Sequence, residues 1–213
     1  MKCGAGGVRS AARFAGIGLA AAVFYQLVVR TRVLNWGARP AEIEAHLPGD
    51  DLLPDADGVA TRAISIEASP HHIYPWLVQM GPTPRGGAYT YDWIENLFGL
   101  NMHSADHILD DFQHPRIGDK VGVGPNSMVV EIADPGHCFA TRSADGNWVW
   151  AFTIVPDGTG ARLISRNRFR LPRPADRIGM VIMEPGSLVM ERKMLRGIKE
   201  RAEQLAEQDR PGR

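Results

Sequence analysis

Three histidines and two neighbouring aspartates are the sharpest candidate for chemistry in the sequence. They are His103, His107, Asp110 or Asp111, and His114, which follow one another at steps of three or four residues. On a continuous helix they would share one face and could bind a metal ion, since imidazole and carboxylate groups are common ligands. Pro115 and the polar flanking residues argue against a regular helix here. We therefore expect a solvated loop, no metal site and no cofactor.

The motifs of nucleophilic and nucleotide-dependent catalysis do not occur in the sequence. There is no Gly-x-Ser-x-Gly elbow, no phosphate-binding Gly-x-x-x-x-Gly-Lys-Ser/Thr loop and no dinucleotide fingerprint. Cys3 and Cys138 are too few for a disulfide framework or a cysteine zinc site. We predict no catalytic residue. An enzyme is still conceivable, because Tyr89, Tyr91 or Arg62 could act on an enol inside a cavity.

Arginines on predicted strands are the next candidates. Arg62 shares a strand face with Ile64, whereas Arg166 and Arg168 share a face with Ile164. A buried arginine needs a carboxylate, because an unpaired buried charge costs several kcal/mol. The candidate partners in this chain are Glu131 and Glu191, and a ligand headgroup is the alternative. It is equally consistent with the pattern that these arginines emerge at the outer face of a sheet or pair within the domain.

A stripe of aromatic residues accompanies them. Trp148, Trp150 and Phe152 alternate on one face of a predicted strand. Such a stripe is more often core than binding surface, but in a hollow fold the core and the pocket lining are the same layer.

Alternation and turn signals predict an α+β domain that positions these side chains. Residues 60–67 alternate as a first strand, residues 70–80 form a helix interrupted at Pro75, and residues 89–100 form a second helix. Five strand-like runs at hairpin spacing follow, over 120–124, 127–133, 137–143, 148–155 and 162–171. From Pro185 onward, apolar residues at helical spacing predict one long amphipathic C-terminal helix.

The net charge of the chain argues against one class of partner, and its composition divides it into four segments. The 213 residues carry 24 basic and 24 acidic side chains, with a pI near 7.1. Without a concentrated basic face, we expect no nucleic-acid partner. We predict an apolar N-terminal helix over 1–32, a linker over 33–58, a globular domain over 59–208 and a disordered tail over 209–213. The sequence does not indicate an oligomeric state.

Residues 14–29 form an apolar run with no charge and one amide, Gln26. At about 1.5 Å per residue the run spans roughly 24 Å, less than the ~30 Å of hydrocarbon, so flanking arginines would have to reach the interface. Small residues lie within the run and bulky ones at its end, which favours an uncleaved anchor over a removable signal. We predict a single-pass membrane anchor of open orientation. The alternatives are a helix docked on the domain and a soluble cytoplasmic protein.

Several motifs of the chain resemble the START-like superfamily, which includes polyketide cyclase/dehydrase and lipid transport proteins. They are Thr61-Arg62-Ala63-Ile64, Pro75–Gly81, Arg85-Gly86-Gly87, Tyr89-x-Tyr91-Asp92-Trp93-x-Glu95-Asn96, Gly118-Asp119 and Met190–Met194. The resemblance covers residues 33–206 and is greatest to a bacterial branch that often carries an N-terminal apolar helix. It implies a helix-grip fold, in which a curved antiparallel sheet wraps a long C-terminal helix, with two short helices after the first strand.

The resemblance also implies a cavity between the sheet and the C-terminal helix. We predict that it binds a hydrophobic or amphipathic small molecule, a lipid or lipid-like metabolite, beside a membrane. The predicted ligand-binding residues are Arg62, Trp76, Tyr89, Tyr91, Trp93, Trp150, Arg166 and Glu191. The alternatives are an aromatase/cyclase-like enzyme using polar groups in the same cavity, and a domain whose interior is filled by its own side chains.

Overall fold

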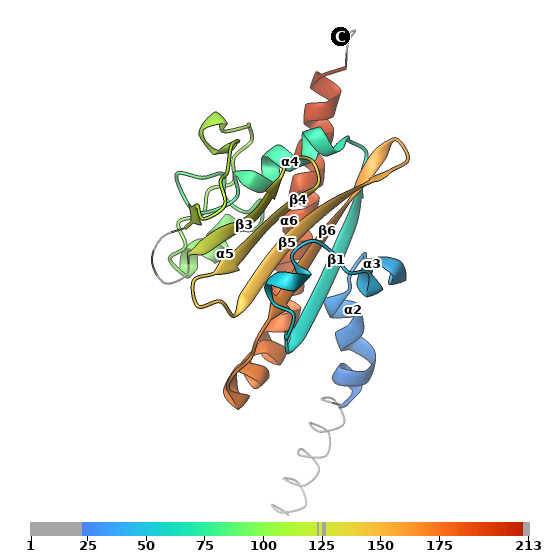
Figure 1. Cartoon of the computed structure of the whole chain (residues 1–213), viewed down its shortest axis with the longest axis vertical. Helices are drawn as coiled ribbons and strands as arrows, with labels where there is room; N and C mark the ends of the chain where they lie inside the picture. The colour runs from blue at the N-terminus through green and yellow to red at the C-terminus, as the bar shows by residue number, and fades with distance from the viewer. Residues whose placement is uncertain (1–22, 123, 125–126, 211–213) are drawn as a thin grey trace, which may run out of the picture.

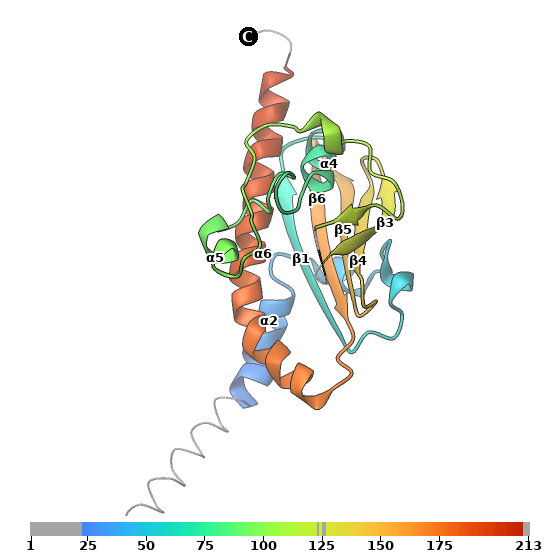
Figure 2. The same ribbon diagram turned by 90° about the vertical axis from the view of Figure 1, so that its left-hand side faces the viewer.

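The computed structural model describes residues 23–122, 124 and 127–210 and shows a six-stranded antiparallel sheet with a long helix across one face (Figures 1 and 2). The strand order is β1-β6-β5-β4-β3-β2. The strands are β1 (Gly58–Ile66), β2 (Lys120–Val121), β3 (Met128–Asp134), β4 (Cys138–Ser143), β5 (Trp148–Asp157) and β6 (Gly160–Phe169). The predicted α+β class and helix-grip fold are confirmed by this topology.

Helices lie on both sides of the sheet, with α4 and α6 on its inner face. They are α2 (Arg30–Leu34), α3 (Pro40–Glu44), α4 (Pro70–Val78), α5 (Asp92–Leu97) and α6 (Pro174–Gln208), with short helical segments η1 (Tyr25–Val29), η2 (Asp50–Leu52) and η3 (Asp110–Phe112). The core on the inner face joins α4, α6 and the sheet, with Ile73, Leu77, Leu163, Leu195 and Ile198 fully buried. Apolar burial of this kind is the main force that holds α6 on the sheet.

Two predicted helices have different bounds in the structure. The C-terminal helix begins at Pro174, eleven residues before the predicted start, because Pro185 is tolerated inside it. A proline within a helix removes one hydrogen bond and bends the axis without having to end the helix, and Figure 2 shows the first turns of α6 at an angle to the rest. The second helix is shorter than predicted, since positive φ angles at Tyr89 and Gly99 limit it to Asp92–Leu97.

The segment predicted as a linker, residues 33–58, lies largely against the outer face of the sheet (Figure 1). Two arginines of β6 hold it there. The guanidinium of Arg162 pairs with Glu42 at 2.7 Å, and that of Arg166 pairs with Asp50 at 2.7 Å. Leu52 packs against the buried cluster of the outer face. The inner and outer faces of the sheet are therefore both covered.

The predicted membrane anchor falls mostly outside the described residues, as do residues 211–213 of the predicted tail. Of the apolar run 14–29, residues 23–29 are described, and they are helical up to the start of α2. Within the described part of the chain, no helix is both long enough and apolar enough to cross a membrane.

Candidate functional site

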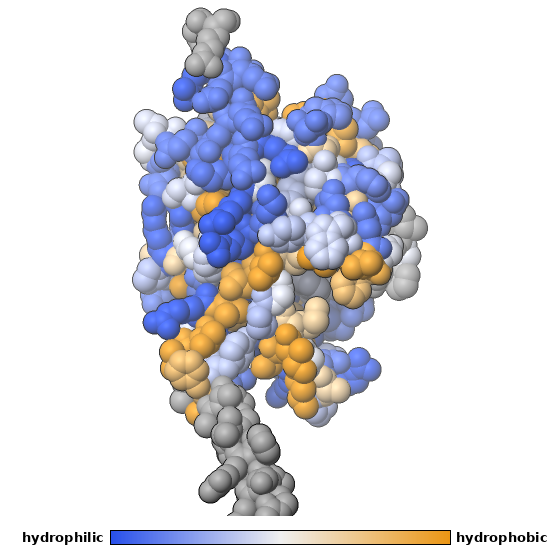
Figure 3. Space-filling view, turned by 180° about the vertical axis from the view of Figure 1, so that it is seen from behind, coloured by the Kyte–Doolittle hydropathy of each residue, from blue (hydrophilic) through white to orange (hydrophobic). Residues whose placement is uncertain are grey.

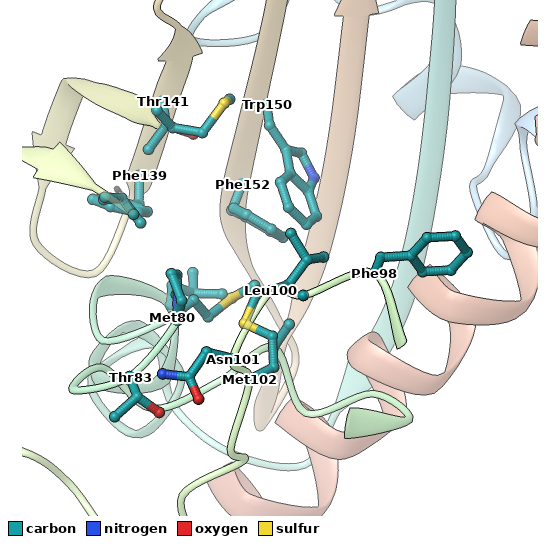
Figure 4. A pocket seen from close by; sticks show the side chains of 18 residues that line it. Met80, Thr83, Phe98, Leu100, Asn101, Met102, Phe139, Thr141, Trp150 and Phe152 are labelled. Carbon is teal, nitrogen blue, oxygen red and sulfur yellow. The ribbon is translucent and has the colours of Figure 1, made fainter. Parts of the chain in front are cut away.

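A cavity of about 480 Å³ lies on the inner face of the sheet, between strands β2 to β5, the end of α4 and the segment that follows α5 (Figure 4). Most of its 18 lining residues are apolar. The largest of these are Leu77, Met80, Phe98, Leu100, Met102, Met128, Phe139, Trp150 and Phe152. The volume falls in the range of small-molecule sites, roughly 300 to 1,000 Å³.

Strand alternation builds the aromatic wall of the cavity. Alternate residues of a strand point to the same face, so Trp150 and Phe152 of β5 both point inward. The antiparallel register places Thr141 of β4 opposite Trp150, and Phe139 opposite Phe152. The rings of Trp150 and Phe152 lie 5.0 Å apart, within the usual range for aromatic pairs. Four inward residues of two strands thus form one continuous surface.

The opposite wall comes from the segment 98–102, which has no regular structure. Gly99 and Asn101 have positive φ angles, so the chain turns sharply there. The backbone N–H of Thr83 donates to the carbonyl of Asn101 at 3.0 Å, which ties the segment to the end of α4. Figure 4 shows Leu100 and Met102 directed among the lining side chains, whereas the ring of Phe98 points away from them.

None of the described residues that line this cavity is titratable. Its polar side chains are the neutral Thr83, Asn101 and Thr141, and the indole N–H of Trp150 donates to the hydroxyl of Ser165 at 2.9 Å. Such a lining can accept an apolar body and one or two hydrogen-bonding groups. It offers no counter-charge to an ionised ligand.

The cavity is displaced from its predicted place, because no residue of α6 lines it. Between α6 and the strands β1 and β6 lies a buried, ion-paired network. Arg62 pairs with Glu191, and the same carboxylate accepts hydrogen bonds from Ser165 at 2.7 Å and from Asn167 at 3.3 Å. Burial raises the pKa of Glu191, while Arg62 and the Ser165 hydroxyl act in the opposite direction.

Glu191 is one of the two candidate partners of Arg62 considered from the sequence, and the ion pair between them is present in the structure. The Arg62 guanidinium also donates to the carbonyl of Val33 and to the hydroxyl of Ser187, both at 3.1 Å. Its side chain is 1% exposed, so these acceptors satisfy it without a ligand. Arg166 takes the outer-face alternative and pairs with Asp50, far from the cavity lining.

The predicted aromatic site residues lie in three different places. Trp150 lines the cavity. Trp76 and Tyr89 are buried beside it, with ring centroids 5.9 Å apart, and the Tyr89 hydroxyl donates to the Trp76 carbonyl at 3.0 Å. Tyr91 and Trp93 are 38% and 66% exposed at the start of α5. Of the eight predicted residues, only Trp150 contacts the cavity.

The histidine and aspartate cluster does not come together. Residues 101–109 are not helical, so their spacing of three and four residues does not bring these side chains to one face. His103 lies within 3.0 Å of the Thr83 hydroxyl, and His107 pairs with its neighbour Asp106. Among the described residues, no group of three or more His, Cys, Asp or Glu side chains could hold a metal ion.

Sequence reasoning missed the other wall residues for identifiable reasons. Phe139 and Thr141 alternate on β4 in register with Trp150, so pairing β4 with β5 could have found them. Leu100 and Met102 carry no such signal, because the irregular segment 98–102 has no periodicity.

Comparison with known proteins finds similar solved structures at low sequence identity. No protein-family model matches it, and no curated protein matches it in sequence. It is similar to a solved polyketide cyclase-like protein of Corynebacterium glutamicum at 18% sequence identity. The match covers 73% of this chain and 97% of that chain, with a TM-score of 0.44. It is also similar to the KanY protein, with 14% identity, 68% and 97% coverage and a TM-score of 0.45.

A third similar structure is the Aha1 dimer of Colwellia psychrerythraea, with 16% identity, 68% of this chain, 96% of that chain and a TM-score of 0.41. All three likenesses lie below 25% identity and below a TM-score of 0.5. At this level of likeness they say nothing about a ligand or a reaction of this chain.

Proposed function

We propose that this protein binds a neutral, largely apolar small molecule in the cavity between β2–β5 and the segment 98–102. One observation carries the proposal: a cavity of about 480 Å³ is lined mainly by apolar side chains and by no titratable one. Three of the lining residues, Met80, Met102 and Met128, are methionines, whose flexible thioether side chains adapt to ligands of different shape. A lipid-like metabolite with a hydroxyl or carbonyl group suits this lining.

We include in the proposal that the domain is held at a membrane by its N-terminal residues. The support is the uncharged apolar run 14–29, which ends directly before α2. A tether of this kind would keep the cavity close to a bilayer, where lipid-like molecules are concentrated.

The cavity favours binding over the aromatase/cyclase alternative. That reaction needs a group on the cavity wall that can move a proton. Tyr89 and Arg62, two candidates for the role, are engaged by the Trp76 carbonyl and by Glu191, and neither lines the cavity. Tyr91 is also outside the lining. We therefore place the ligand, and not a catalytic residue, at the centre of the proposal.

Fluorescence titration of the full chain with N-phenyl-1-naphthylamine, a neutral apolar probe, tests the proposal. Leu100→Trp should fill the cavity from its edge and weaken probe binding by about tenfold or more, the loss expected for roughly 1.4 kcal/mol of contact. Leu97→Trp is the matched control, because Leu97 is three residues away, 76% exposed and outside the lining. Equal affinity of both variants and the parent protein would contradict the proposed site.

Solvent extraction of the purified full chain, followed by mass spectrometry, tests the ligand class. We expect neutral lipid-like molecules from the parent protein and a reduced yield from Leu100→Trp. Recovery of only charged metabolites would contradict the proposed class.

A further inference from the structure

Large apolar side chains are exposed together where α6 begins and where the described chain begins. We call this set the apolar face. Its members are Val23, Phe24 and Val28 of the N-terminal helical segment and Ile178, Ile182, Met183 and Val189 of α6, each between 39% and 72% exposed. Figure 3 shows apolar atoms of these two elements on the same side of the molecule. Exposed patches of this kind mark interaction sites.

A buried carboxylate joins the two elements of the apolar face. The side chain of Glu184 is 2% exposed and pairs with Arg30 at 2.8 Å. It also accepts a hydrogen bond from the hydroxyl of Tyr25 at 3.1 Å. This partly buried ion pair, together with the Tyr25 hydrogen bond, fixes the N-terminal segment alongside α6. The polar contacts therefore lie between the two elements, while their apolar side chains are left outside.

Cations without carboxylate partners adjoin the apolar face. Within the described residues, Arg32, Arg192, Lys193 and Arg196 form no ion pair. The guanidinium groups of Arg192 and Arg196 lie 5.2 and 5.9 Å from the centre of the Trp36 ring. An apolar zone followed by a basic zone matches the acyl and headgroup layers of an anionic membrane.

The course of the chain indicates what covers this face. Residues 14–22 precede Val23 and contain no charged side chain. A chain that enters a bilayer through these residues would bring the adjoining apolar face to the bilayer surface.

We propose that the apolar face and its flanking cations dock on an anionic lipid bilayer and so orient the domain. The docking rests on the membrane tether of the proposed function, but it is a separate contact. A tether alone would leave the side chains of α6 in water.

The test uses the full chain with Cys3→Ser and a single introduced cysteine carrying a bimane label. Ile182→Cys reports on the apolar face, and Thr159→Cys is the control, because Thr159 is exposed at the β5–β6 turn, distant from the start of α6 (Figure 1). Cys138 is 1% exposed and should not be labelled. Vesicles contain phosphatidylcholine and phosphatidylglycerol at about seven to three, with brominated acyl chains as quencher.

We expect the label at Ile182→Cys to lose most of its fluorescence on these vesicles and the label at Thr159→Cys to lose little. Adding Arg192→Gln, or removing phosphatidylglycerol, should weaken the quenching at Ile182→Cys. One surface cation contributes about fivefold to membrane affinity.

Flotation of the same samples separates this inference from the tether. Co-flotation without quenching at Ile182→Cys would overturn the docking and leave the tether standing. Failure to float would overturn both, while probe binding in the cavity would be unaffected. A disulfide-linked dimer of the unlabelled Ile182→Cys variant under air oxidation, together with no quenching of the labelled variant, would assign the face to a second copy of the chain and overturn the docking.

Discussion

The inner face of the sheet has two halves that differ in charge and in filling. Over β1 and β6, α6 closes the sheet around Arg62 and Glu191, whose charges are paired and hydrogen-bonded. Over β2–β5 the sheet faces a cavity whose lining carries no charge. Both halves are built from inward-pointing residues of neighbouring strands, which the antiparallel pairing of β4 with β5 and of β5 with β6 sets opposite one another. They meet at Ser165, which accepts a hydrogen bond from Trp150 and donates one to Glu191.

The difference follows from the cost of leaving charges buried. A buried ion pair is tolerated only where its partners fill the space and satisfy each other, because an unpaired buried charge costs several kcal/mol. A hollow lined with neutral groups has no such requirement, so it can be empty or occupied. The buried charges therefore lie in the closed half, and we place the proposed ligand in the hollow half.

The largest effect is expected from breaking the ion pair of the closed half. Glu191→Ala leaves the guanidinium of Arg62 buried without a carboxylate, and we expect a loss of about 3–5 kcal/mol in the free energy of unfolding. Urea denaturation measures it. The double variant Arg62→Met/Glu191→Leu should recover most of the loss, because both charges are removed. A single variant as stable as the parent would show that the pair does not hold this half closed.

A smaller loss is expected where Gly197 of α6 approaches the backbone of Tyr89. A Cβ atom at Gly197 would lie 2.6 Å from the carbonyl oxygen of Tyr89, so Gly197→Ala should cost about 1–3 kcal/mol of overpacking. Gly179→Ala in the same helix is the control. A Cβ there meets nothing within 4 Å, and helix propensity should raise stability by up to about 1 kcal/mol. Equal effects in urea denaturation would contradict the close packing of α6.

The closed half was more accessible from the sequence than the hollow half. Strand alternation places Arg62 on the same strand face as Ile64, and the need to pair a buried charge limits the partners of Arg62 to a few carboxylates. The cavity depends instead on the segment 98–102, whose positive φ angles at Gly99 and Asn101 have no periodic signature. Its position relative to α6 depends on packing between distant segments, which a pattern along the chain does not contain.

Similar limits explain the helix bounds. Pro185 is a plausible helix start in sequence, but the helix runs through it from Pro174, where the Asp176 carboxylate accepts a hydrogen bond from the backbone N–H of Arg173. Trp93, predicted as a site residue on an amphipathic helix, is exposed because α5 lasts only from Asp92 to Leu97.

Removing the hydroxyl at the junction of the two halves should affect both. Ser165→Ala leaves the indole N–H of Trp150 and one oxygen of Glu191 without this partner, and a loss of about 1–3 kcal/mol in unfolding free energy is expected. Probe affinity in the cavity should also fall, since Trp150 loses the bond that orients its ring. Titration with N-phenyl-1-naphthylamine beside urea denaturation separates the effects. A stability loss with unchanged affinity would show that the halves are independent.

The last prediction concerns the outer face, which is closed like the α6 half but carries a thiol. Burial raises the pKa of Cys138 to about 12. Because this value lies above that of the unfolded chain, the stabilising contribution of the neutral thiol is present below about pH 8.5 and is lost as the pH rises towards 12. In the Cys3→Ser variant at about pH 8, iodoacetamide should alkylate the native protein roughly a thousandfold more slowly than the unfolded chain. Mass spectrometry measures both rates. Native alkylation at the unfolded rate would show that residues 50–53 do not close the outer face. The outer face would then be open to solutes, as the hollow half of the inner face is.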